Sequence, residues 1–177
     1  FSIVGIPAEE YPELPTVSSE TSLKLPSETL RSMIRQTLFA VADNDAKPIH
    51  TGTLFELEPD HIRLISVDGY RLAIREESIR CDLKTSFVVP GKTLSEVLKL
   101  LGEELELQIS RRHILFSIRN YTVISRLLEG EFLDYRAAIP NECSTEMKVS
   151  TQDFISSIER VSLLITDRLK SPVRCIF

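Results

Sequence analysis

Apolar and polar residues alternate with two different periods along this chain, and the changes of period mark out its expected elements. From residue 26 to about residue 42, apolar residues recur three and four positions apart, which predicts a helix with one buried side. The same spacing predicts a second helix over residues 93–101, with Gly102 as its C-cap. Elsewhere, short segments that alternate between apolar and polar residues predict antiparallel strands. They cover residues 22–25, 53–57, 61–67, 70–76, 87–89, 105–110, 114–118 and 121–128.

Asp68-Gly69 lies between two of these strands. Asp-Gly supplies the positive φ values of a two-residue hairpin turn, so residues 61–67 and 70–76 are expected to pair as a tight β-hairpin. On the second strand, Tyr70 and Leu72 are expected on one face and Arg71 on the other. Such a turn is a common structural device, and it indicates a function only together with other motifs.

The pattern of the chain starts again near residue 148. Residues 24–27 correspond to residues 148–151, an offset of 124 positions (148 − 24 = 124). Apolar periodicity alone aligns any two helices, but it does not also align prolines and an aspartate. We therefore expect one complete repeat over about residues 17–140, with two helices and about eight strands, between the end of a preceding copy and the start of a following one. Further matches at this offset are Leu30 with Phe154, Asp43 with Asp167 and Pro48 with Pro172.

The composition is that of a globular protein, with 42% hydrophobic and 27% charged residues. No apolar run approaches the roughly 18 residues of a transmembrane helix, and no charged leader precedes an apolar block. The three cysteines, Cys81, Cys143 and Cys175, are far apart, so we expect a reducing, cytoplasmic setting without disulfides or zinc. The chain does not begin with Met and its first residues resemble a strand, so we expect it to be part of a longer protein.

The net charge of −5 excludes a protein whose whole surface is basic, so any contact with DNA requires a local basic face. Arg31 and Arg35 lie four apart on the first predicted helix. Lys92 and Lys99 lie seven apart on the second and share one of its faces. The alternative explanation of these side chains is ordinary solvated charge.

The motifs of catalysis are not found. Gly91-Lys92-Thr93 resembles the end of a nucleotide-binding P-loop, but Ser86 stands where that loop needs a glycine, and Pro90 lacks an N–H for a phosphate. The histidines are scattered, and no nucleophile lies in an elbow motif. We expect no catalysis, no cofactor and no metal site.

Five motifs in order resemble those of bacterial sliding clamps, the β subunits of DNA polymerase III. The resemblance implies a DNA-clamp fold of the α+β class, in which each repeated domain has two helices on one face of antiparallel sheets. Residues 1–12 would then end a first domain, residues 13–140 would form the complete middle domain, and residues 141–177 would begin a third. The motifs are Lys47-Pro48-Ile49, Thr53-Leu54-Phe55-Glu56, the segment 67–73, the segment 87–94 and the segment 130–136.

The same resemblance implies a ring of two subunits that encircles double-stranded DNA without regard to its sequence. The basic inner helices would face the phosphates and the acidic outer surface would repel them. The implied partners are a second copy of the protein, the DNA polymerase III alpha subunit, the clamp loader and other proteins with clamp-binding motifs, with no membrane. The residues implied to face DNA are Arg31, Arg35, Asn44, Lys92, Lys99 and Arg160.

The family also has a peptide-binding groove between its middle and third domains. Leu72, Val67 and Leu133 would form an apolar cup, with Arg71 and Lys47 at its rim. The implied groove residues are Lys47, His50, Val67, Gly69, Tyr70, Arg71, Leu72, Leu133, Ala137 and Ala138. Departures from the family pattern are Val67 for a usual Thr, Tyr70 for His, Leu133 for Pro and Ala137 for a frequent Arg.

Two other functions compete with a processivity clamp. One is a stand-alone α+β peptide-binding module that captures partner strands at its hairpin edge, and the other is a nucleotide-dependent enzyme. The repeat favours the clamp, because a lone module has no reason to begin again at residue 148.

Overall fold

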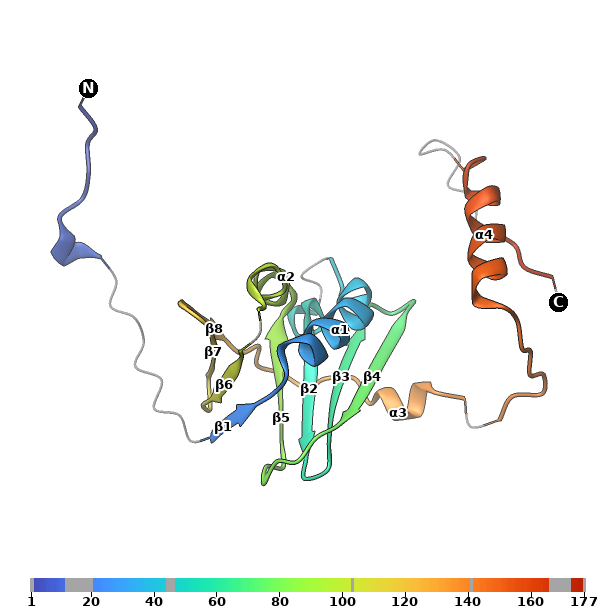
Figure 1. Cartoon of the computed structure of the whole chain (residues 1–177), viewed down its shortest axis with the longest axis horizontal. Coiled ribbons are helices and arrows are strands. Elements are labelled where there is room, and N and C mark those ends of the chain that lie inside the picture. Colours follow the sequence, from blue (N-terminus) through green and yellow to red (C-terminus); the bar gives the residue numbers. More distant parts are fainter. Residues whose placement is uncertain are drawn as a thin grey trace. The chain divides into compact units, whose positions relative to one another are not determined.

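The computed structural model describes residues 2–11, 21–43, 47–102, 104–140, 142–165 and 173–176. Two compact units divide the chain: Phe1–Tyr135 and Arg136–Phe177. The first unit contains eight described strands and two described α-helices, as the sequence predicts (Figure 1). Among the described residues, no helix is both long and apolar enough to cross a membrane.

The first unit consists of two successive β-α-β-β-β segments. The first holds β1 (Thr21–Lys24), α1 (Ser27–Thr37), β2 (Gly52–Glu58), β3 (His61–Val67) and β4 (Leu72–Ser78). The second holds β5 (Thr85–Pro90), α2 (Gly91–Leu100), β6 (Glu106–Ile109), β7 (His113–Ile118) and β8 (Tyr121–Arg126). Short 3-10 turns lie at η1 (Ala8–Glu10), η2 (Leu38–Ala40) and η3 (Pro48–Thr51).

The two segments exchange their first strands. One sheet has the order β1-β6-β7-β8 and the other has the order β4-β3-β2-β5, and all pairs are antiparallel. Each sheet therefore contains three strands of one segment and the first strand of the other. This exchange ties the two halves into one body, since neither half completes a sheet alone.

Both helices begin directly after a proline: Pro90 is the last residue of β5, and Pro26 follows the end of β1 by two residues. Pro26 (φ −57°) precedes α1 and Pro90 (φ −55°) precedes α2. Proline has no N–H to leave unpaired, and its fixed φ is compatible with the start of a helix. The strand–proline–helix sequence thus sets where each helix leaves its sheet.

One hydrophobic core joins both sheets and both helices. Leu30 and Ile34 of α1 and Leu94 of α2 are fully buried there, together with Phe55 of β2 and Phe116 of β7. The helices lie next to each other over the sheets (Figure 1) and leave their polar sides in solvent.

The β3–β4 connection differs from the predicted two-residue hairpin. It is a four-residue loop, and β4 begins at Leu72 rather than at residue 70. Only Gly69 of the predicted turn has a positive φ (+89°). The carboxylate of Asp68 accepts hydrogen bonds from the backbone N–H groups of Tyr70 (3.0 Å) and Arg71 (2.9 Å). This side-chain capping holds both residues outside the strand ladder, so their predicted strand faces are wrong.

The helix ends also differ from the prediction. α1 ends at Thr37 and continues only as η2, because the Thr37 hydroxyl donates to the carbonyl of Met33 (2.9 Å) and competes with regular helical bonding. α2 begins at Gly91, two residues earlier than predicted. Its C-cap is Leu101, whose backbone is extended, so Gly102 does not serve as the C-cap. Residues 2–7 form no strand in the described part of the chain.

The second unit contains α4 (Thr151–Ser162), and α3 (Tyr135–Ala138) begins at the last residue of the first unit. The hydroxyl of Ser150 caps α4 by accepting from the N–H of Asp153 (3.4 Å). α4 begins 124 residues after α1 (151 − 27 = 124), which is the offset found in the sequence.

Candidate functional site

A cavity of about 530 Å³ opens on the first unit between two connecting segments. One wall is η3 with the lysine before it, and the other is the segment that follows β8. The lining residues are Lys47, Pro48, Ile49, His50, Glu129, Gly130, Glu131, Phe132, Leu133 and Asp134.

The second wall is fastened to the β4-β3-β2-β5 sheet at both of its ends, once at the edge strand β5 and once on the sheet's outer face. At one end the N–H of Leu128 donates to the carbonyl of Val88 (2.9 Å). At the other end Tyr135 is 4% exposed and packs in a small cluster with Leu54 and Ile65. The cavity is therefore shaped by a segment that the sheet holds in place.

Polar bonds add to the anchoring of Tyr135. Its hydroxyl donates to Glu56 (2.7 Å) and accepts from Arg63 (3.2 Å), and the two charged residues are 3.1 Å apart. Arg63 also pairs with Glu76 (2.8 Å from Nε). Burial, with the hydrogen bond to Glu56, raises the pKa of Tyr135. Burial alone would lower the pKa of Arg63, but its hydrogen bonds to Glu76, Tyr135 and Glu56 raise it instead.

An aromatic contact joins the two walls of the cavity. The rings of His50 and Phe132 meet edge to face, with centroids 5.4 Å apart. Burial and the nearby charge of Lys47 lower the pKa of His50 below its ordinary value. Its imidazole is therefore neutral at neutral pH and acts as part of the apolar lining.

The loop between β3 and β4 presents one side chain and restrains another. Tyr70 is 98% exposed at the tip of the loop. Arg71 pairs with Asp68 through Nε (2.8 Å) and its terminal nitrogen (2.5 Å), and its guanidinium lies over the ring of Phe39 (5.9 Å). The backbone N–H of Tyr70, then the side chain and N–H of Arg71, lower the pKa of Asp68 to about 2. The ion pair between Asp68 and Arg71 therefore persists at any physiological pH.

The structure brings together part of the predicted groove. Lys47, His50 and Leu133 line the cavity. Val67 and Leu72 face each other across β3 and β4, and Leu72 packs on the cluster that also receives Phe132. Gly69, Tyr70 and Arg71 form the loop at the end of these strands. Ala137 and Ala138 are exposed and belong to the second unit.

Sequence reasoning missed two residues that form much of the cavity. Phe132 supplies its aromatic wall and Ile49 its buried floor. Both lie inside the quoted motifs, but neither shows a distinctive spacing. Phe132 and Ile49 come together with His50 only when residues 47–50 pack against residues 129–134. No local sequence pattern indicates this packing.

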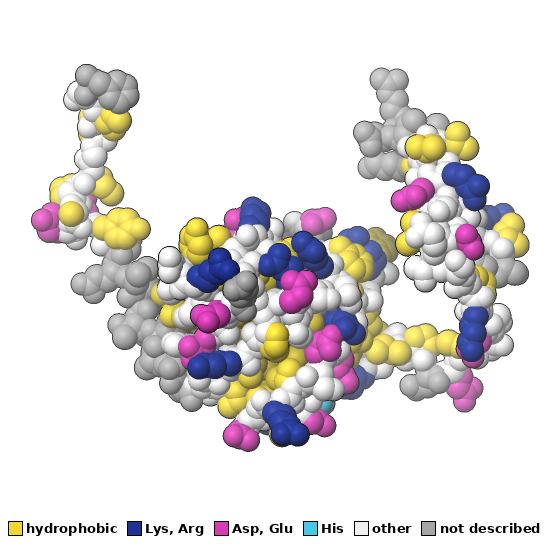
Figure 2. Space-filling view, viewed as in Figure 1, with side chains coloured by type: hydrophobic (Ala, Val, Ile, Leu, Met, Phe, Trp, Pro, Cys, Tyr) yellow, Lys and Arg dark blue, Asp and Glu magenta, His cyan; other side chains and the backbone are white. Residues whose placement is uncertain are grey.

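The basic residues of the two helices have different surroundings. Arg35 on α1 and Lys92 on α2 are exposed, and Lys99 is exposed and paired with Glu96 (2.7 Å). Arg31 is half-buried and donates to the carbonyl of Leu101 at the end of α2. Figure 2 shows Lys and Arg side chains over the surface of α1 and α2, among acidic and apolar ones.

Two further residues, Arg160 and Asn44, were predicted to face DNA. Arg160 is exposed on α4, where it donates to the carbonyl of Ser156 (3.2 Å). Asn44 lies outside the residues that the structure describes.

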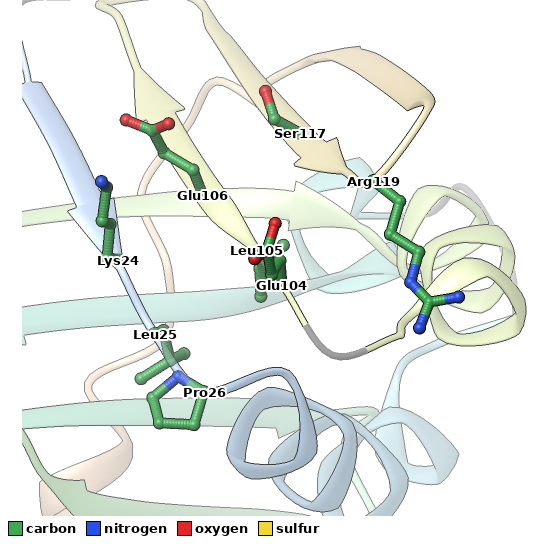
Figure 3. Close-up of a pocket in the computed structure, with 8 residues that line it drawn as sticks. All are labelled: Lys24, Leu25, Pro26, Glu104, Leu105, Glu106, Ser117 and Arg119. Atoms are coloured by element: carbon green, nitrogen blue, oxygen red, sulfur yellow. The ribbon is translucent and has the colours of Figure 1, made fainter.

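A second cavity, of about 520 Å³, lies where β1 meets α1, where β6 begins and where β7 ends, and it was not predicted from the sequence. Figure 3 shows Lys24 and Arg119 on opposite sides of it, with Glu106 near Lys24. Arg119 has a positive φ (+49°) in the β7–β8 turn. The described residues contain no cluster of His, Cys, Asp or Glu that could hold a metal ion.

Comparison with known proteins gives one consistent result. Residues 24–134 match the family "DNA polymerase III beta subunit, central domain". The chain is 34% identical to the beta sliding clamp of Bacillus subtilis over 98% of its own length and 47% of that protein. A DNA polymerase III beta subunit from Eubacterium rectale has a structure that matches with a TM-score of 0.90 at 34% identity, over 95% of this chain and 47% of that one.

A solved sliding clamp from Bacillus subtilis gives a TM-score of 0.86 at 35% identity, over 92% of this chain and 44% of that one. The chain thus spans about half the length of the relatives it matches.

Proposed function

The chain belongs to the family of bacterial DNA polymerase III beta subunits, the sliding clamps, and on this basis we propose that the protein containing it is a processivity factor. As a non-catalytic subunit it encircles duplex DNA and tethers the replicative polymerase. The observation that carries the proposal is the match of nearly the whole described fold to solved clamps, at a TM-score of 0.90.

The charge distribution of the first unit supports contact with DNA through its helices. α1 and α2 each carry two basic residues and one acidic residue, whereas the whole chain has a net charge of −5. A weakly basic face attracts phosphates without reading bases, so a ring lined by it slides freely. Arg35, Lys92 and Lys99 are the residues of the first unit that we place toward DNA, with Arg160 doing the same in the second unit.

We assign three domain segments to the chain. Residues 1–12 end a first clamp domain, residues 13–140 form the middle domain, and residues 141–177 begin a third. The family match over residues 24–134 and the equal starts of α1 and α4 in the repeat support this division. The boundary at residues 12 and 13 lies outside the described residues.

The cavity beside His50 and Phe132 forms part of the groove that receives partner peptides. Its apolar lining, with charged residues at the edge, is the usual make-up of a peptide hot spot. The partners proposed for the intact protein are the polymerase alpha subunit, the clamp loader and other proteins with clamp-binding motifs, together with a second copy of itself.

The experiment that tests the ring is imaging of the full-length protein in solution by electron microscopy, alongside its mass by light scattering. We expect closed two-subunit rings with a central hole wide enough for duplex DNA. A monomer without a hole would contradict the proposal and favour the stand-alone peptide-binding module.

A further inference from the structure

We propose that the cavity between residues 47–50 and 129–134 selects peptides that carry a lysine or arginine next to their apolar anchor residues. The inference rests on the proposed function, because it takes the cavity as part of a peptide-binding groove. The groove would distinguish one peptide from another by the charge of the residues that flank the apolar anchors.

The apolar lining sets the need for an anchor residue. Ile49 is buried at the floor, Phe132 is half-buried against His50, and Leu133 is 42% exposed at the edge. A partner side chain that covers Leu133 and Phe132 removes apolar surface from water, which is favourable in proportion to the area covered.

The charges at the edge of the cavity are mainly acidic. Glu131 and Asp134 are exposed, and neither makes an ion pair or side-chain hydrogen bond within the described part of the chain. Glu129 already lies 3.4 Å from Arg126 and 3.9 Å from Arg112, so its charge is compensated. Two unpaired carboxylates therefore remain on this wall, and Lys47 is the unpaired cation on the opposite wall.

The neighbouring loop does not offset these carboxylates. Arg71 is held by two bonds to Asp68 and lies over Phe39, so its charge is engaged within the loop. His50 is neutral at neutral pH. A basic peptide side chain would meet Glu131 and Asp134 as partners, whereas an acidic one or a nucleic-acid phosphate would be repelled.

Binding of three fluorescent peptides to the full-length protein tests this inference by anisotropy. The peptides share the same two leucines and one phenylalanine and differ only in flanking residues, which are lysines, serines or glutamates. We expect affinity to fall in that order, by about two- to fivefold at each step for exposed charge pairs. The order should fade between about 0.1 M and about 1 M salt, as the Debye length falls from about 10 Å to about 3 Å.

Matched variants locate the effect. The double substitution Glu131→Gln and Asp134→Asn should bring the lysine and glutamate peptides to within about twofold of each other. Lys47→Gln removes a positive charge from the other wall, so it should increase the ratio of the affinity for the lysine peptide to that for the glutamate peptide.

The possible failures are distinguishable. Equal binding of all three peptides, with binding lost in Leu133→Ser, would overturn the charge selectivity and leave the groove intact. Failure of every peptide to bind would overturn the groove and the selectivity together. Preference for lysine that persists in the double variant would also contradict the inference.

Discussion

At the residue scale, the most informative side chain is Tyr135, the last residue of the first unit. Its ring is buried against the sheet, and its hydroxyl is the partner of both Glu56 and Arg63. The segment that carries Phe132 and Leu133 runs directly into it. We infer that Tyr135 is a positioning residue for the cavity wall.

Replacing Tyr135 with Phe should lower the free energy of unfolding by about 1–3 kcal/mol, because it keeps the ring but leaves a half-buried charged pair short of one partner. Urea denaturation followed by circular dichroism measures this. Tyr121→Phe is the matched control, since Tyr121 is 56% exposed and its hydroxyl makes no described hydrogen bond. A loss in Tyr135→Phe no larger than in the control would refute the anchoring role.

The sequence alone could not identify Tyr135 as an anchor. It could be assigned to a linker motif by resemblance, but its partners are 79 and 72 positions away along the chain. Burial in the small cluster depends on the register of β2, β3 and β5, which alternation does not determine. Residues whose role depends on distant pairing are in general the ones that local patterns miss.

At the element scale, the alternation of apolar and polar residues predicted the positions of the strands well. The Asp-Gly motif predicted the β3–β4 turn, but not its length. Segment 61–67 matches β3 in full, because it is a short run rich in Ile, Leu and Val that begins with alternation and lies between polar boundaries. The following strand begins two residues late because Asp68 bonds the N–H groups of Tyr70 and Arg71. An Asp-Gly pair thus signals a turn, while its length depends on what the aspartate side chain binds.

The two helices are linked at this scale by Arg31, which reaches from α1 to the end of α2. Arg31→Met should therefore destabilise the first unit by about 1–2 kcal/mol, because the carbonyl of Leu101 loses a charged donor. Arg35→Met is the matched control, one turn further along the same helix and exposed. It should change stability by less than about 0.5 kcal/mol. Thermal or urea unfolding of both variants checks this, and equal losses would show that the Arg31 contact is unimportant.

The comparison of these two arginines also refines the interpretation of the helix charges. The resemblance to sliding clamps implied that both face DNA, and their spacing showed only that they lie four residues apart on one helix. The structure engages one of them in holding the helices together and leaves the other in solvent. The two arginines differ only because Arg31 contacts the end of α2. The spacing of residues within α1 does not indicate this contact.

At the scale of the whole molecule, the internal repeat was the most useful signal in the sequence. It predicted a second helix start 124 residues after the first, and α4 begins there. The exchange of first strands between the two halves of the first unit was not predicted, because strand order depends on long-range pairing. The cavity was not predicted for the same reason, since its two walls are about 80 residues apart in the chain.

We propose that the intact protein holds DNA by topology rather than by affinity. The most direct measurement is the retention of the full-length protein on a nicked circular plasmid, onto which the proposed clamp loader has loaded it, before and after the plasmid is cut to a linear form. The account predicts retention on the circle at high salt and rapid loss from the free ends after cutting. Equal retention on circular and linear DNA, or loss from both as salt rises, would contradict it.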